Sequence, residues 1–218
     1  MRNAKQLALT LGLAAALGVG WAGRALAQDP RLQGRVPESV RGAINQLVSA
    51  ARADGLPTEP LVDRALEGAS KGAEAQRILA AVQRLEGELR TARDALGPVS
   101  TPTEIAAGAS ALRAGARAED LARLREMRGG QPLTVAAAVL ADLVAVGVPT
   151  DTAVAAVLVL AAAADDAEYM AFRQNVERDI ALGASPITAL GVRLGAAAEY
   201  LDLNAGVDRA GASRPRKP

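Results

Sequence analysis

Residues 132–164 read PLTVAAAVLADLVAVGVPTDTAVAAVLVLAAAA. The stretch contains two Ala/Val/Leu-rich segments, Pro132–Val146 and Thr150–Ala164, which are separated only by Gly147-Val148-Pro149. Glycine can adopt the left-handed conformation that closes a helix, and proline lacks the N–H group that a continuing helix would need. The sequence therefore predicts a buried helical hairpin here, around which the other helices pack.

Apolar residues also recur at helical spacing outside this hairpin. The clearest case is residues 73–96, where the apolar residues are three or four positions apart: Ile78, Val82, Leu85, Leu89, Ala92 and Leu96. This spacing predicts a long bundle helix, with Glu86–Arg90 and Arg84–Glu88 ion pairs on its solvent-facing side. Because glycine and proline divide the rest of the chain into similar segments, the expected fold class is all-α.

Three similar helix starts recur along the chain. Pro57-Thr58-Glu59, Pro102-Thr103-Glu104 and Pro149-Thr150-Asp151 lie 45 and 47 residues apart. In each, threonine can cap free N–H groups, and the acid that follows lies near the positive end of the helix dipole. The spacing predicts tandem helical hairpins in an α-solenoid-like array with a period near that of HEAT or armadillo repeats, or else a multi-helix bundle that reuses a common cap.

Residues 1–27 have the features of a secretory signal peptide. Arg2 and Lys5 are followed by the apolar stretch Leu7–Gly23, and Ala25-Leu26-Ala27 matches the small-x-small site after which cleavage would leave Gln28 as the first residue. The alternative is an uncleaved membrane anchor, since the apolar stretch is near the lower length limit for a span. We expect an exported protein, in the periplasm or outside the cell.

The rest of the chain divides into three expected parts. Residues 28–36 are a polar linker, residues 37–202 a single helical repeat-like domain, and residues 203–218 a disordered basic tail. Removal of residues 1–27 leaves 22 basic and 24 acidic side chains, a net charge of −2, so nucleic acid is not an expected partner. Nor do we expect a membrane span after cleavage, because the 13 uncharged residues from 152 to 164 fall short of the ~20 that a span needs.

The composition excludes several kinds of chemistry. The chain contains no cysteine and no histidine, so it has no thiol nucleophile, no Ser-His-Asp triad, no disulfide and no structural zinc site of the usual kind. Asp165, Asp166 and Glu168 form the densest acidic cluster. Such residues are also favoured at helix starts, and no EF-hand spacing is present, so the sequence predicts no metal site.

A few other residues are candidates for chemistry. Asp142, which interrupts an apolar helix, is expected on an exposed edge, although burial would make it an ion-pair partner. Glu86 and Glu88 point to different helix faces and do not form a glycosidase pair. Arg173 and Arg178 are interpreted as surface charge. Gly191 and Gly195 have the small-xxx-small spacing, which favours tight internal packing over a dimer interface.

These observations favour a non-enzymatic, exported helical-repeat protein. It would act as a protein-interaction or structural module in the bacterial cell envelope, with another envelope protein as its partner. No catalytic, cofactor-binding or metal-binding residue is predicted, and the oligomeric state stays open. One alternative is a periplasmic carrier of an apolar ligand or lipid, with a cavity lined by Val139, Leu143, Val157 and Leu160. The other is a carboxylate-dependent hydrolase.

Overall fold

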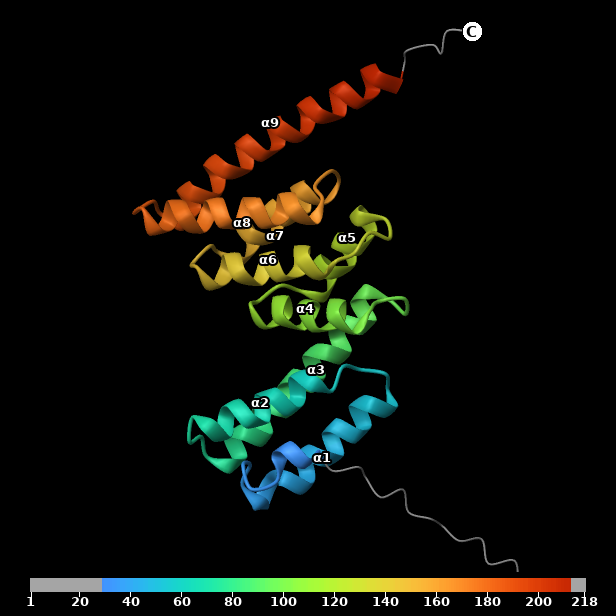
Figure 1. Ribbon diagram of the computed structural model, residues 1–218, viewed down its shortest axis with the longest axis vertical. Helices are drawn as coiled ribbons and strands as arrows, with labels where there is room; N and C mark the ends of the chain where they lie inside the picture. The colour runs from blue at the N-terminus through green and yellow to red at the C-terminus, as the bar shows by residue number, and fades with distance from the viewer. Residues whose placement is uncertain (1–28, 213–218) are drawn as a thin grey trace, which may run out of the picture.

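The computed structural model describes residues 29–212, with side chains as far as residue 199, and the chain is helical throughout its ordered elements (Figure 1). After a 3-10 turn, η1 (Pro30–Leu32), the helices are α1 (Glu38–Ala53), α2 (Glu59–Ser70), α3 (Ala75–Leu96), α4 (Pro102–Arg113), α5 (Ala118–Arg128), α6 (Thr134–Ala145), α7 (Thr150–Ala161), α8 (Asp166–Ala181) and α9 (Pro186–Ala212). The all-α prediction is confirmed. The expected signal peptide lies outside the described residues, as do the last six residues of the expected tail.

From α4 onward the helices form a two-row array. Helix α6 packs between α4 and α8 in one row, and α7 packs next to α5 and α9 in the other. The whole molecule extends from α1 at one end to α9 at the other (Figure 1). The predicted hairpin is the pair α6–α7, and it is the middle unit of three stacked pairs. Its residues are apolar because neighbouring helices cover it on both sides.

Helix α3 joins the N-terminal helices to this array. It has 22 residues, a length of about 33 Å, and it packs against α1, α2, α4 and α5. The predicted apolar stripe from Ile78 to Leu96 is buried. The Glu86–Arg90 ion pair is present, but the Arg84–Glu88 prediction is wrong. Glu88 instead accepts from Arg113 Nε at 3.0 Å, because α4 brings that guanidinium across the helix–helix interface.

The array repeats with a shorter period than the one predicted. The N-cap residues of α4, α6 and α8 are Thr101, Leu133 and Asp165, and the starts of α5 and α7, at positions 118 and 150, are separated by the same interval. The Pro-Thr-acid starts do not mark equivalent positions, since Pro149 precedes α7, the second helix of its pair. Within these starts, Thr58 caps no N–H group, whereas Thr101, one position before the second motif, does.

The first helix of each pair ends in the same turn. Gly115, Gly147 and Gly183 have φ values of +107°, +96° and +102°, and the N–H group of the next residue donates to the carbonyl five positions back, at 3.0 Å in each case. This Schellman turn requires the left-handed conformation that glycine adopts readily. Helix α8 has 16 residues against 12 in α4 and α6, so α9 begins one turn further along its partner. Helix α9 also diverges from α8 towards its C-terminal end (Figure 1).

Two segment boundaries differ from the expected division of the chain. Residues 29–36, expected as a linker, belong to the folded domain: η1 and the next residues bury Leu32 and Val36, at most 2% exposed, and the Asp29 N–H donates to Asn45 Oδ1 at 3.1 Å. The cause is an apolar pair, four positions apart, inside a polar segment. At the other end, α9 includes residues 203–212, for which the sequence predicted disorder.

Candidate functional site

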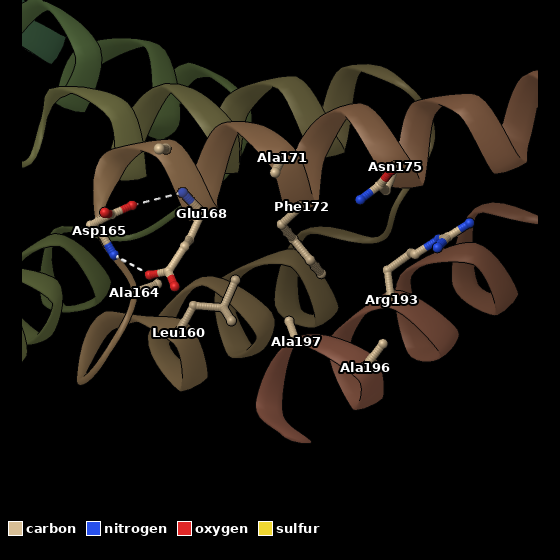
Figure 2. Close-up of a pocket in the computed structure, with 11 residues that line it drawn as sticks. Leu160, Ala164, Asp165, Glu168, Ala171, Phe172, Asn175, Arg193, Ala196 and Ala197 are labelled. Atoms are coloured by element: carbon tan, nitrogen blue, oxygen red, sulfur yellow. Dashed lines mark hydrogen bonds between the residues drawn. The ribbon is translucent and has the colours of Figure 1, made fainter. Parts of the chain in front are cut away.

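A groove of about 530 Å³ opens between the first half of α8 and α9, beside the end of α7 (Figure 2). Its floor is apolar: Leu160, Ala164 and Phe172 are at most 3% exposed, and Phe172 projects from α8 towards α9 (Figure 2). The walls consist of alanines, Ala167 and Ala171 on α8 and Ala196 and Ala197 on α9. The groove stays open because these side chains are too short to fill the space left by the divergence of α9.

The two ends of the groove are polar. At the α8 N-terminus, Asp165 Oδ1 accepts from the Glu168 N–H at 2.8 Å, and Glu168 Oε2 accepts from the Asp165 N–H at 2.7 Å (Figure 2). At the other end lie Asn175 and Arg193. Arg193 donates to both carboxylate oxygens of Asp179, at 2.6 and 2.7 Å, and this contact holds the pKa of Asp179 below its ordinary value.

A buried arginine fills the space on the other side of the same helix start. Arg128, at the end of α5, is 3% exposed. Its guanidinium donates to Pro132 O at 2.9 Å, to Ala164 O at 2.9 Å and to Asp166 Oδ1 at 3.1 Å. The same guanidinium lies 5.2 Å from the centre of the Tyr169 ring. Arg128 therefore links the start of α6 and the start of α8 to α5.

Tyr169 completes this junction from α8. The residue is fully buried, and its hydroxyl donates to Val157 O of α7 at 2.8 Å. Burial disfavours the phenolate and raises the pKa of Tyr169 to about 12, although the nearby Arg128 acts in the opposite direction. Its hydroxyl therefore stays neutral and serves as a hydrogen-bond donor inside the junction.

Glu104 plays a comparable role in the preceding pair of helices. It is 5% exposed, and its carboxylate accepts from the N–H groups of Thr101 and Leu133, at 2.8 and 2.9 Å, and from Arg125 at 3.0 Å. Burial disfavours the charged form, yet these backbone and side-chain donors outweigh it and hold the pKa of Glu104 below its ordinary value. The contact with Leu133 joins the start of α4 to the start of α6.

A second groove, of about 570 Å³, runs between α5 and α7. Two exposed apolar side chains lie in it, Met127 at 42% and Val159 at 54%. Its other lining includes the oppositely charged neighbours Arg117 and Asp120, which form an ion pair at 3.1 Å. This groove therefore has both signs of charge side by side, whereas in the α8–α9 groove the two acids lie at one end and Arg193 at the other.

The acidic residues considered from the sequence do not come together. Asp165 and Glu168 cap α8, Asp166 pairs with Arg128, and Asp179 pairs with Arg193. Asp142 lies on an exposed edge, as predicted: its side chain is 48% exposed and 3.4 Å from Arg173. Arg178 contacts Asn175. Within the described residues, no group of three or more acidic side chains is placed to hold a metal ion.

Two other expectations are not met. The residues expected to line an apolar cavity are at most 2% exposed and belong to the packed core: Val139, Leu143, Val157 and Leu160. Of these four, only Leu160 lines a pocket described above, at the floor of the α8–α9 groove. Gly191 and Gly195 do not mediate tight internal packing. Both are exposed, and a Cβ added at either position would meet no other described residue within 4 Å.

Sequence reasoning missed the residues that organise this region. Arg128, Phe172 and the alanine walls carry no motif that singles them out. The sequence does contain a pattern that predicts the starts of α4 and α8. Thr101-x-x-Glu104 and Asp165-x-x-Glu168 both have the spacing of a capping box. The interval from Gly115 to Gly147 also equals the one from Thr101 to Leu133, so the glycine spacing gives the period directly.

No model of a known protein family, no curated protein and no solved structure matches the chain. Among the helices of the described residues, none is both long enough and apolar enough to cross a bilayer.

Proposed function

We propose that the chain is an exported, non-enzymatic helical-repeat protein that binds another protein of the bacterial cell envelope. The observation that supports this proposal is the α8–α9 groove, an open surface with an apolar floor at one end of the array. Tandem helical pairs present extended surfaces of this kind to partners. A partner that covered Ala171 and Ala196 would remove apolar surface from water at little conformational cost.

The chemistry of the groove also favours binding over catalysis. The two carboxylates at its edge, Asp165 and Glu168, are engaged as helix caps, and Arg193 is held by Asp179. Groups fixed in this way suit recognition, because they need no reorganisation when a partner arrives.

Site-specific cross-linking in the native bacterium tests the proposal. A photoreactive amino acid at Ala171, in the groove, should give one discrete adduct with another protein. The matched position is Ala145, which is exposed at the end of α6 and outside the grooves described above, and it should give none. Equal adduct patterns at both positions, or no adduct at Ala171, would overturn the proposed binding role.

The export part of the proposal has a separate test. Mass spectrometry of the chain purified from the periplasm or medium should give a mature protein that begins at Gln28. A chain that keeps residues 1–27 and stays in the cytoplasm would refute export, and it would leave the cross-linking result to be judged on its own.

A further inference from the structure

We propose that the α8–α9 groove binds a short amphipathic helix of the partner whose polar side is basic. This inference rests on the proposed function and specifies the chemistry of the partner. It combines the shape of the groove, its apolar floor and the uncompensated negative charge around it.

The shape of the groove suits a helix. It is bounded by two helices and runs along α8 from Asp165 to Asn175, a distance of about 15 Å or three helical turns. Helix-in-groove recognition places apolar anchors at positions i, i+4 and i+7 against such a floor. Here Leu160 and Phe172 supply that floor, and the alanine walls let another backbone approach closely.

The surrounding charge selects a basic partner. Residues 134–199 carry eight acidic side chains against three arginines, a net charge of −5, whereas residues 29–133 carry 14 acidic against 15 basic side chains. Two of those three arginines are already paired: Arg173 lies against Asp142 and Glu177, and Arg193 against Asp179. The charged side chains that line the groove itself are Asp165, Glu168 and Arg193. Because Arg193 is already paired with Asp179, the groove has an excess of negative charge.

The excess of negative charge is greatest at one end of the groove. Among the described side chains, neither Asp165 nor Glu168 forms an ion pair, and both lie beside the apolar floor. The dipole of α8 offsets only about half of one elementary charge there. Lysine or arginine at the matching end of a bound helix would meet these two carboxylates, and the Asn175 end would take an uncharged polar residue.

Two synthetic peptides of equal length test this inference. One places leucine at i, i+4 and i+7 with lysine on its polar side, and the other replaces every lysine with glutamate. Fluorescence anisotropy with residues 28–218 should show the Leu–Lys peptide binding at least about 10-fold more tightly at low salt, with the difference shrinking as salt screens the charges. Equal binding of the two peptides, or tighter binding of the Leu–Glu peptide, would overturn the inference.

Variants separate the groove from general attraction to an acidic surface. Ala171→Trp and Ala196→Trp fill the groove from opposite walls, and each should weaken Leu–Lys binding about 10-fold or more. Ala145→Trp, outside the groove, should leave the binding unchanged. Glu168→Gln keeps a side chain that can reach the Asp165 N–H and should weaken the binding about 2- to 5-fold at low salt. Unchanged binding in both groove variants would refute the site.

The two proposals fail separately. If the Ala171 cross-link forms in cells but the Leu–Lys peptide does not bind, the basic helix is wrong and the binding role stands. If the cross-link is absent as well, both fall.

Discussion

The two sides of the α8 N-terminus differ in what fills them. Towards α5, the long side chain of Arg128 occupies the junction and places donors on two carbonyls and a carboxylate. Towards α9, the facing residues are alanines, and a groove of about 530 Å³ results. The start of α8 is therefore covered by a polar side chain on the α5 side and borders an open groove on the α9 side.

The side chains that stabilise the fold therefore lie apart from the groove that is proposed to bind a partner. A buried guanidinium is costly unless all its donors are satisfied, so Arg128 fixes the geometry of three segments at once. The alanine side chains of the groove need no hydrogen-bond partners, and their small size leaves space in the groove. Substitutions in filled junctions should therefore lower the unfolding free energy most, and substitutions along the open face should lower it least.

Arg128→Met should cost about 3 kcal/mol of unfolding free energy, because it leaves Pro132 O and Ala164 O without their donor. Urea unfolding followed by circular dichroism measures the change. The control is Arg123→Ala, an exposed arginine on the same helix, which should change stability by less than ~0.5 kcal/mol. A similar loss in both variants would contradict a special role for the Arg128 junction.

Glu104→Gln should cost about 2 kcal/mol at neutral pH, since an amide cannot accept from three donors as the carboxylate does. Because the pKa of Glu104 is lower in the folded state than its ordinary value of 4.5, ionisation stabilises the fold above about pH 4.5. That stability is lost as the pH falls through the folded-state pKa.

The gap between wild type and Glu104→Gln should therefore close in acid. Urea titrations at a series of pH values give this profile, with the exposed Glu126→Gln as a control that shows no such gap. A gap that persisted below the folded-state pKa would indicate that the charge of Glu104 is not its cause.

Gly147→Ala should cost about 1.5 kcal/mol, because alanine is strained in the left-handed region. Its φ is +96°, and the new Cβ would also lie 3.3 Å from Pro186 Cγ. Gly191→Ala, on the open face of α9, should instead stabilise the protein by about 0.5 kcal/mol through helix propensity. Thermal unfolding compares the two, and a loss at position 191 would mean that this face is packed.

Ala171→Trp should change stability by less than ~0.5 kcal/mol, because the groove has room for the indole. Ala136→Trp, at a fully buried position in α6, should cost more than ~3 kcal/mol by overpacking. Urea unfolding of the pair compares the free space beside α8 with the filled core. A large loss at position 171 would show that the groove is closed in solution.

Much of the fold follows from local sequence patterns. The apolar stripe from Ile78 to Leu96 and the break at Gly147-Val148-Pro149 are predictable because helix periodicity and turn chemistry act over a few residues. The predicted period of the array is wrong because a proline-threonine pair can begin either helix of a hairpin. Long-range contacts depend on which helices pack together. The ion pair of Glu88 with Arg113, instead of with Arg84, is an example.

The groove could not be predicted from the sequence for the same reason. Alanine is common in helices for its propensity alone, so Ala171 and Ala196 carry no sign that they border open space. Their role depends on the extra turn of α8 and the divergence of α9, which bring distant residues to the two sides of one gap. Arg128 likewise resembles a surface charge until its three acceptors are placed around it.

The proposed binding of a basic helix in the α8–α9 groove is tested most directly by amide NMR. Isotope-labelled protein, residues 28–218, would be titrated with the Leu–Lys peptide, and the shifts of its amide signals mapped onto the chain. The largest shifts are expected in residues 160–175 and 193–197, around the α8–α9 groove. Shifts concentrated instead in residues 117–127 and 151–159, along the α5–α7 groove, or spread evenly over the array, would contradict the proposal.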